Sequence, residues 1–520
     1  MTSLRAPNTL LGVALLLGIC ADLLFYGRGV GVSAPIFVAL GLAALLMISR
    51  SEGRPGGTNL WLGAAALSFA AWLAVRDEPM LVALNWLALI SLLLLLTVGF
   101  RSDALHRLPP VRLASRAFLA IFEIGAYPIV LAVNQIGQIP LRGGQIRKLA
   151  PIIRGLLLAA PLLLIFGGLL ASADSIFASY VNQILRLRLP FDFATSVTHL
   201  IMVGFFTSIV GGGMIVSLAE GMRVAPALPA EGDTERLDRS GLAWRVLGST
   251  EAITVLMLLD LLFAGFMVIQ GAYLFGGLDS LALTGMSFAD NARRGFFEML
   301  TVAMLSLGLL CALAVVTRRE SPARRQVFNA ASAAMVLLVL GILASAFQRM
   351  WLYELAYGFT RLRIYTHSFM IWLAVVLLLF VVALVAARPQ IFLAGGFASA
   401  LVYLTILNIV SPDALIVREN IARYQAALSA LTVTPGDDLF GRSSYDENVD
   451  LNYLLSLSSD AVPDLVKALP ILNPTQRTEA MSQLVAMNHQ LYLANQRDGW
   501  QGWHMSHFDA SMAILRAVSP

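Results

Sequence analysis

Residues 79–100 read PMLVALNWLALISLLLLLTVGF, a stretch that contains no charged side chain. About 20 consecutive apolar residues in an α-helix are long enough to cross the ~30 Å hydrocarbon core of a bilayer. Turn and charge signals precede the stretch at Arg76, Asp77 and Glu78. The stretch therefore predicts a membrane-spanning helix.

Similar apolar runs recur along the chain. Hydrophobic residues make up 58% of the 520 residues and charged residues 13%, whereas soluble domains are about 25% charged. This composition predicts an all-α polytopic transmembrane helix bundle with about 11 spans. Besides 79–100, the predicted spans lie near 9–26, 33–49, 58–75, 152–171, 194–220, 245–275, 295–317, 327–347, 366–387 and 390–410.

The segment 117–139 is ambiguous. It is moderately apolar, but it carries Glu123, Asn134 and Gln135, and arginines flank it on both sides. If both flanks are cytoplasmic, the segment lies in the interface or re-enters the membrane. If it crosses, the chain has about 12 spans and every later loop changes sides.

The distribution of basic residues favours the first alternative. With 11 spans and a cytoplasmic N-terminus, inner segments hold about 20 Lys/Arg and outer loops about 9, as the positive-inside rule requires. The cluster Arg318, Arg319, Arg324 and Arg325 is then inside. The three arginines Arg349, Arg361 and Arg363 fall outside, against the rule. We predict a bacterial inner-membrane protein with a cytoplasmic N-terminus and a periplasmic C-terminus.

The character of the chain changes after the transmembrane region, residues 1–410. Residues 411–520 hold 7 Lys/Arg and 12 Asp/Glu and lack a long apolar run. Amphipathic patterns predict a small, soluble, acidic helical domain, which the topology makes periplasmic. Its helices are predicted near 413–430, 449–457, 460–469, 474–495 and 507–518. A protein partner in the periplasm is an expectation for this domain.

Motifs for known catalytic chemistry are missing from the sequence. There is no P-loop, H-E-x-x-H, G-x-S-x-G or C-x-x-C pattern, so no catalytic residues and no cofactor are predicted. The two cysteines, Cys20 and Cys311, each lie in an apolar run, and no metal site is predicted. The basic charge lies in loops that orient the protein, so nucleic acid is not an expected partner, whereas the lipid bilayer is.

The helix near 245–275 carries the first candidate functional group. Asp260 lies close to the middle of this span, where a charged side chain costs about 2.5–3.5 kcal/mol on insertion scales. It should therefore face protein or water, either as a proton or cation site or as a neutral group that bonds a neighbouring helix. Gln270 lies further along the helix. Arg293, Arg294 and Glu298 precede or begin the next span, and Arg294 and Glu298 have the i, i+4 spacing of a local ion pair.

A second candidate region follows the span near 327–347. Aromatic residues and charged residues alternate there, and its candidate members are Arg349, Glu354, Arg361 and Arg363. This edge fits an interfacial belt with snorkelling arginines, or a site for an anionic headgroup or substrate. Trp500 and Trp503 in the tail are interpreted as packing residues or as contacts with the membrane surface.

Several stretches, taken together, resemble a bacterial family of polytopic inner-membrane proteins known only as domains of unknown function (DUF 4173 / DUF 4153 type). They are 270–277 and 288–298, then 173–177, 357–363, 411–413, 420–424, 450–454 and 460–463. Similar proteins often have a tyrosine where this chain has Asn291, and a polar residue such as asparagine at Asp260. The resemblance implies a multi-span membrane protein and supplies no activity.

Three kinds of function remain open from the sequence. The first is a non-enzymatic envelope or signalling component whose external helical tail binds a partner. The second is a proton- or ion-coupled transporter or flippase-like carrier that uses Asp260 and the Arg294/Glu298 region. The third is a membrane-embedded enzyme that modifies lipids, for which the sequence shows no pair of base and nucleophile.

Overall fold

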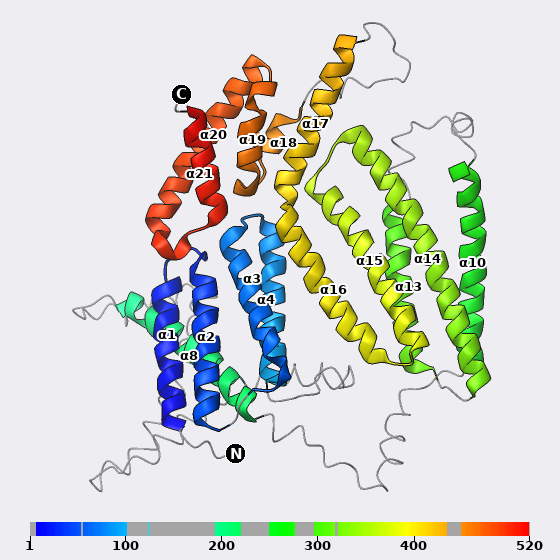
Figure 1. Cartoon of the computed structure of the whole chain (residues 1–520), viewed down its shortest axis with the longest axis horizontal. Helices are drawn as coiled ribbons and strands as arrows, with labels where there is room; N and C mark the ends of the chain where they lie inside the picture. The colour runs from blue at the N-terminus through cyan, green and yellow to red at the C-terminus, as the bar shows by residue number, and fades with distance from the viewer. Residues whose placement is uncertain are drawn as a thin grey trace, which may run out of the picture. The chain divides into compact units, whose positions relative to one another are not determined.

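The structure is a computed structural model, and it describes residues 7–53, 56–100, 124, 193–219, 249–275, 296–317, 321–433 and 449–518. The described residues form helices joined by turns, with no β-strand among them, so the predicted all-α class is confirmed (Figure 1). They belong to two compact units. The first unit comprises 1–75, 82–225 and 492–505, and the second comprises 76–81, 226–491 and 506–520.

The first unit contains apolar helices and one short loop from the tail. Its elements are α1 (Pro7–Phe25), α2 (Ser33–Ser51), η1 (Thr58–Leu60), α3 (Trp61–Val75), most of α4 (Pro79–Gly99), α8 (Phe193–Ala219) and η6 (Gly499–Gly502).

The second unit begins with residues 76–81, which include the start of α4, and contains the remaining helices. They are α10 (Ser249–Phe275), α13 (Phe296–Val316), α14 (Pro322–Tyr357), α15 (Arg361–Val385), α16 (Pro389–Val410), α17 (Pro412–Val433), α18 (Leu451–Leu455), η4 (Ser459–Ala461), α19 (Val462–Ala468), η5 (Leu469–Ile471), α20 (Pro474–Asp498) and α21 (Met505–Val518). In α20 the first unit begins at Tyr492, and in α21 the second unit resumes at Ser506.

Seven helices in the described residues are long and apolar enough to cross a membrane. Three shorter apolar stretches, in α8, α10 and α13, match three more predicted spans. The predicted span at 152–171 and the ambiguous segment 117–139 lie outside the described residues, apart from Ile124. The chain is therefore a helical protein with several potential spans, and the total of about 11 stays a prediction.

Helix α1 shows why these sequences suit a membrane. Its buried residues recur every three or four positions, as on one face of a helix, and they include Leu10, Ala14 and Leu17. On other faces Leu16 is 61% exposed and Leu23 is 67% exposed. Because apolar side chains on all sides are typical of helices in lipid, this pattern agrees with the span prediction.

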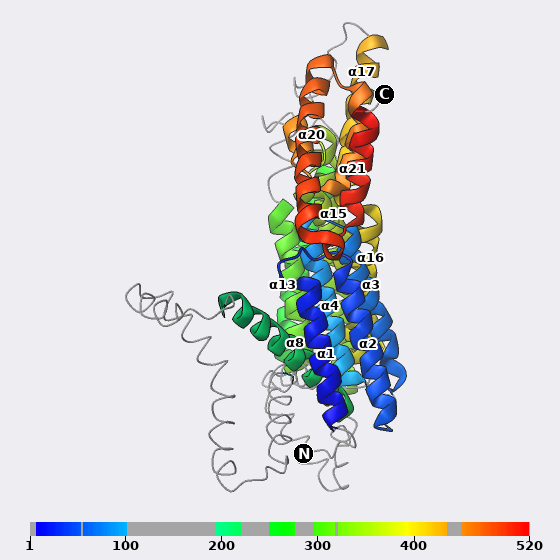
Figure 2. The same ribbon diagram turned by 90° about the vertical axis from the view of Figure 1, so that its left-hand side faces the viewer.

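Helices α1 and α8 pack closely against each other in the first unit (Figure 2). A Cβ atom on Gly18 would lie 2.1 Å from Oγ1 of Thr207 and 2.6 Å from the carbonyl oxygen of Val203. Small residues allow helix backbones to approach in this way within a membrane. Gly18 therefore sets the distance between the two helices.

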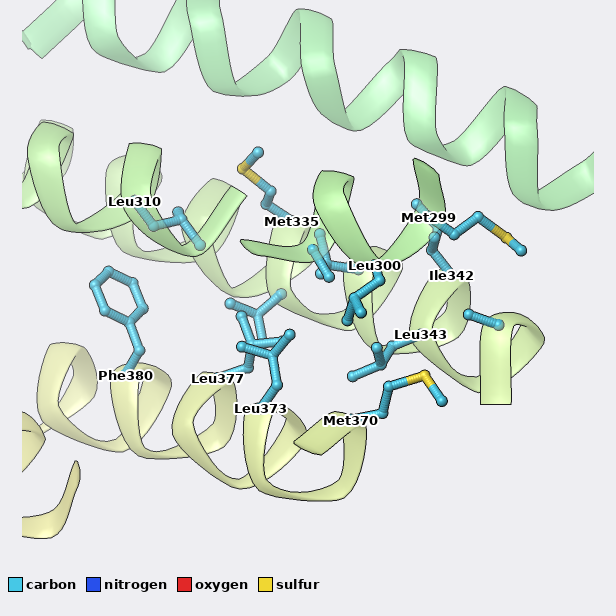
Figure 3. Packing of buried hydrophobic residues seen from close by; sticks show 14 of the residues in the cluster. Met299, Leu300, Leu310, Met335, Ile342, Leu343, Met370, Leu373, Leu377 and Phe380 are labelled. Carbon is cyan, nitrogen blue, oxygen red and sulfur yellow. The ribbon is translucent and has the colours of Figure 1, made fainter. Parts of the chain in front are cut away.

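The second unit has a large apolar core between α10, α13, α14 and α15. Leu310, Met335, Leu343 and Leu377 are almost fully buried in it, and Figure 3 shows labelled side chains of α13, α14 and α15 pointing toward one another. Dispersion contacts of this density hold helices together where lipid removes the hydrophobic driving force.

The helices from α17 to α21 share a second apolar core in the same unit. It includes Ile416, Leu454, Leu484 and Ile514, and Ile364 at the start of α15 also belongs to it. Helix α20 begins as its sequence predicts, because the N–H of Gln476 donates to Oδ1 of Asn473 at 2.8 Å and Pro474 occupies the first helical position.

Candidate functional site

Five charged residues of the second unit form a cluster where α4, α15 and α17 begin. We call this the charge cluster, and its members are Arg76, Glu78, Arg361, Asp413 and Asp460. The side chains of its three carboxylates are at most 2% exposed. Buried carboxylates are costly unless they are paired and hydrogen-bonded, so their partners decide whether the cluster is stable.

The strongest contact of the cluster joins Arg361 and Asp413. Nε of Arg361 donates to Oδ1 of Asp413 at 2.8 Å, and Nη2 donates to Oδ2 at 2.6 Å. This two-point geometry is specific to arginine and gives strong, charge-assisted hydrogen bonds. The N–H of Ser458 also donates to Oδ2 of Asp413 at 2.8 Å. The first turns of α15 and α17 are thereby fixed to each other and to the segment before η4.

The local sequence explains where Asp413 lies. Ser411 ends α16 with a φ of 55° in the left-handed region, and Pro412 then begins α17 with a φ angle suited to a first helical turn. Asp413 is therefore in the first turn of α17, where a carboxylate is also favoured by the helix dipole.

Glu78 is the second buried carboxylate, and it caps the N-terminus of α4. Its carboxylate accepts hydrogen bonds from the N–H groups of Met80 at 3.1 Å and Leu81 at 2.6 Å. The hydroxyl of Tyr365 donates to Oε2 of Glu78, and Nε of Arg361 lies 3.8 Å from Oε1. Glu78 therefore connects the start of α4 with two successive turns of α15.

Asp460 in η4 binds the segment before α4. Oδ1 accepts from Nη1 of Arg76 at 3.1 Å, and Oδ2 accepts from the N–H groups of Asp77 at 2.9 Å and Glu78 at 3.2 Å. Arg76 also donates through Nε to the carbonyl oxygen of Asn408 at 2.7 Å. Burial raises the pKa of Asp460, although the backbone N–H of Asp77 and the charge of Arg76 lower it. The carboxylate is well bonded, but its ionised form still carries a burial cost.

The loop between α14 and α15 is held by side chains from α17 and α18. The N–H of Phe359 donates to Oδ1 of Asn420 at 2.9 Å, and Nδ2 of Asn420 donates to the carbonyl oxygen of Phe359 at 2.9 Å. The N–H of Arg361 donates to the hydroxyl oxygen of Tyr453 at 2.8 Å. Burial raises the pKa of this phenol, which keeps it neutral. Backbone groups that the loop would otherwise leave unpaired are satisfied by these contacts.

The predicted edge at Arg349, Glu354, Arg361 and Arg363 is divided between different contacts. Arg361 belongs to the charge cluster, whereas Arg363 donates to the carbonyl oxygens of Tyr357 and Gly358 at the end of α14 and lies 4.3 Å from the ring centre of Tyr353. A cation at a helix C-terminus bonds its free carbonyl groups. Arg349 is half-buried in α14. Arg361 and Arg363 are thus bonded to protein groups.

Glu354, in α14, forms a separate pair with His367 of α15. Its Oε2 lies 2.7 Å from Nδ1 of His367, and the pair is buried beside Phe347, whose ring centre is 3.9 Å from that of the histidine. Oε1 of Glu354 has no hydrogen-bond partner among the described residues. The structure therefore separates Glu354 from Arg361, although the two are close in sequence.

Asp260 is half-buried in α10, and its Oδ1 atom is buried without a hydrogen-bond partner within the described part of the chain. Gln270 and Glu298 lie in α10 and α13, but their side chains are outside the described residues, as are Arg293 and Arg294. The predicted relation between Asp260 and the Arg294/Glu298 pair stays a prediction. In the ranges that the structure describes, no group of three or more His, Cys, Asp or Glu residues could hold a metal ion.

The sequence interpretation named Arg361 as a site residue but not its partners. Asp413, Tyr453 and Asp460 do lie in the stretches that carry the family resemblance, and Glu78 precedes Pro79 as an N-cap would. The sequence could not predict these contacts, because residues that meet in the fold are far apart along the chain: Arg76 and Asp460 are separated by 384 positions.

Comparisons with known proteins identify the family without an activity. No curated protein and no solved structure matched the chain. One family model did match, over residues 63–468, which is well over half of the chain and includes all five residues of the charge cluster. The resemblance inferred from the sequence stretches is thereby confirmed, and the chain belongs to the family described as Domain of unknown function (DUF4153).

Proposed function

We propose that this protein is a non-enzymatic component of a bacterial cell envelope that links an external binding event to its membrane helices. The charge cluster is the observation that carries the proposal. Through it, Asp413 and Asp460 of the C-terminal helices bond the first turn of α15 and the segment that begins α4. A flexible tether would need none of these buried bonds, whereas a relay needs a stiff connection between two elements.

The connection is rigid for a physical reason. Asp413 is fully buried, so Arg361 cannot move away from it without leaving a buried carboxylate unpaired, which costs about 3–5 kcal/mol. A force or rotation applied to α17 is therefore transmitted to α15 through Arg361 and Asp413. We infer that α17, η4 and the first turns of α4 and α15 move as one body.

The orientation of the second unit supports an external tail. Arg324 and Arg325 lie in the first turn of α14, and Gly358 follows its last residue. At 1.5 Å per residue, this helix of 36 residues is about 54 Å long and exceeds the bilayer core. Arg324 and Arg325 thus lie at one end of α14, and the charge cluster lies at the other. By the positive-inside rule the arginines are cytoplasmic, so the C-terminal helices face the periplasm.

The first unit supports an odd total number of spans. Near the end of α4, Cγ2 of Thr97 is 3.5 Å from the Cβ position of Gly213, which lies in the second half of α8. At the other end of α8, His199 pairs with Asp22 near the end of α1. The end of α4 and the start of α8 thus lie on opposite faces of the membrane that these helices are proposed to cross. This arrangement of α4 and α8 favours the predicted 11 spans over 12.

A groove on the C-terminal helices is our proposed partner site. It has a volume of about 720 Å³ between α19, η5, α20 and α21. Apolar side chains that include Leu469, Phe508 and Met512 line it, and Lys467 and Arg516 lie among them. The groove fits an amphipathic partner helix with acidic residues beside its apolar face. Charge complementarity argues for this occupant, since the tail as a whole is acidic but its groove is lined by Lys467, Arg477 and Arg516 against one acidic residue, Asp509.

Photo-crosslinking in intact cells tests the proposed partner. A crosslinking amino acid at Phe508, which is 51% exposed, should capture one envelope protein. Arg516→Glu should reduce the captured band at least fivefold, because like charges then meet across the groove. Gln425→Glu, on exposed α17 surface outside the groove, should leave the band unchanged. An equal band with Arg516→Glu would argue against the groove, and full complementation of a deletion strain by a chain ending after Val410 would argue against the whole proposal.

Asp260 supports a second candidate function, an ion-coupled transporter. A buried carboxylate oxygen without a described partner, inside an apolar helix, is a common feature of proton or cation pathways. Purified protein in liposomes would then show proton-coupled flux that Asp260→Asn abolishes. No flux in the wild type, or equal flux in the variant, would remove this candidate.

A further inference from the structure

A short loop of the C-terminal tail is held against the connection between α1 and α2. This loop, Gly499–Trp503, comprises η6 and the residue after it. The N–H of Val32 donates to the carbonyl oxygen of Trp503 at 3.0 Å, and the side chain of Arg28 donates to the carbonyl oxygen of Arg497. His504 bonds the carbonyl oxygen of Val30. All of these residues belong to the first unit.

Gly31 shows how closely the loop approaches. A Cβ atom at this position would lie 2.4 Å from the carbonyl oxygen of Trp503 and 2.6 Å from the carbonyl carbon of Gly502. The approach also reaches α1 itself, because Nε2 of Gln501 donates to the carbonyl oxygen of Leu23 at 3.5 Å. The position of the loop relative to the first two helices is therefore fixed by side-chain and backbone hydrogen bonds and by close backbone packing.

This position corresponds to the edge of the hydrocarbon layer. Helices α1 and α2 are both candidate spans of 19 residues, and the chain between Phe25 and Ser33 must lie where they leave the membrane. Leu23, in the last turn of α1, is 67% exposed and faces away from the protein. A loop that bonds Leu23 and Val32 therefore lies at the level of the lipid headgroups.

The exposed side chains of the loop suit that level. Trp500 is 60% exposed and Trp503 is 42% exposed. Tryptophan is enriched at membrane interfaces, where its ring is partly buried in lipid and its N–H reaches a polar group. Arg28 and Arg497 lie beside the loop and could bond phosphate groups with their remaining donors.

We propose that Trp500 and Trp503 insert into the headgroup layer of the bilayer that α1 and α2 cross, and so anchor the C-terminal tail to the membrane surface. The partner is phospholipid, identified by the position of the loop and by its pairing of tryptophan with arginine. The inference rests on the spans of the first unit and does not depend on the proposed relay.

Fluorescence quenching in the full-length protein tests this anchor. Wild type and a Trp500→Phe/Trp503→Phe variant are reconstituted into phosphatidylcholine nanodiscs that carry a nitroxide on the headgroup or at acyl carbon 12. The difference in fluorescence between the two proteins is the emission of Trp500 and Trp503. We expect the headgroup nitroxide to quench this difference at least twofold more strongly than the deep nitroxide.

Trp372→Phe provides the depth control. Trp372 lies eleven residues into α15 and donates to Oγ of Ser399 at 3.2 Å, so its fluorescence should be quenched more strongly by the deep nitroxide. Phenylalanine at the loop positions keeps an apolar ring, and unchanged thermal midpoints would show that the fold is intact. If neither nitroxide quenches the loop tryptophans while aqueous iodide does, they face water or a protein partner, and the anchor is wrong.

Discussion

The buried carboxylates of this protein differ in how their charge is compensated. Asp413 has an arginine and a backbone N–H, Glu78 has two N–H groups and a tyrosine hydroxyl, and Asp460 has an arginine and two N–H groups. Three carboxylates face two arginines, so N–H and O–H donors supply the remaining compensation. Stability should therefore depend strongly on single members of the cluster.

Asp413→Asn should lower the free energy of unfolding by about 3 kcal/mol, the lower end for a broken buried pair, because the side chain of Arg361 keeps 32% exposure. Thermal unfolding in nanodiscs measures the change. Asp464→Asn is the control, since Asp464 pairs with Arg418 and Lys467, whose side chains are 53% and 75% exposed, and it should lose about 1 kcal/mol or less. Equal losses of unfolding free energy in the two variants would mean that the buried pair stabilises the protein no more than an exposed one.

Asp460 predicts a pH dependence of stability. Burial raises its folded-state pKa above the unfolded value, so the folded protein binds the proton more tightly. Wild type should gain stability relative to Asp460→Asn as pH falls from 7 toward the unfolded pKa, and should lose that gain as pH rises through the folded pKa. Unfolding curves for both proteins at several pH values measure this. A wild type that loses stability relative to the variant on acidification would show that Arg76 and the two N–H groups dominate.

At the scale of the elements, helix ends and helix crossings depend on glycine. Gly358 ends α14 with φ 77° and ψ −179°, a region that only glycine adopts readily. Gly18 allows α1 and α8 to approach. Neither glycine has a Cβ atom, and this absence allows the backbone geometry around each of them.

Gly358→Ala should destabilise the protein by about 1–3 kcal/mol, because the conformation is strained and its Cβ would lie 2.5 Å from Oδ1 of Asn420. The double hydrogen bond between Asn420 and Phe359 should be lost with it. Gly396→Ala in α16 is the matched control, since no atom lies within 4 Å of its Cβ position, and it should be neutral or stabilising. The thermal unfolding midpoints of the two variants measure the effect. An unchanged midpoint for Gly358→Ala would contradict the strained backbone conformation at this position.

Gly18→Val should separate α1 from α8, because its Cβ position overlaps Thr207. A cysteine pair at Asp22 and His199, which are in contact in the wild type, should then crosslink at least fivefold more slowly. Gly12→Val, with nothing within 4 Å, should leave the rate unchanged. Similar rates in both variants would show that the crossing does not need a small residue.

At the scale of the whole molecule, the spans and loops determine which side each end faces. The positive-inside rule, applied to Arg324 and Arg325 at one end of α14, gives the proposed orientation of the second unit. A chain with an odd number of spans has its termini on opposite sides of the membrane. In the proposed orientation, the tail lies in the periplasm and the start of α14, with Arg324 and Arg325, lies in the cytoplasm.

Reporter fusions test this orientation directly. Alkaline phosphatase fused after Pro520 should be active and green fluorescent protein dark, since each folds on only one side of the inner membrane. The same reporters inserted after Ser321, at the start of α14, should give the reverse result. A fluorescent C-terminal fusion would overturn the orientation and the periplasmic partner with it.

The sequence by itself determined the class of this protein and most of its helices. Runs such as 79–100 are apolar on every face, and a helix in lipid needs no other information, because all its backbone bonds are internal. Stretches near Gly358, Asp413 and Asp460 also identified the family. These features depend on local composition, which can be read along the chain.

The charge cluster was decided by the tertiary structure alone. In the sequence, Arg361 and its neighbours suggested a membrane edge or an anion site. In the structure, Arg361 binds Asp413, and Asp460 binds the segment just before Glu78. Glu354 and Arg361, seven positions apart, have separate partners. The physical reason is that a buried charge is stabilised by whichever groups packing brings within about 3 Å, and sequence spacing does not determine which helix ends meet.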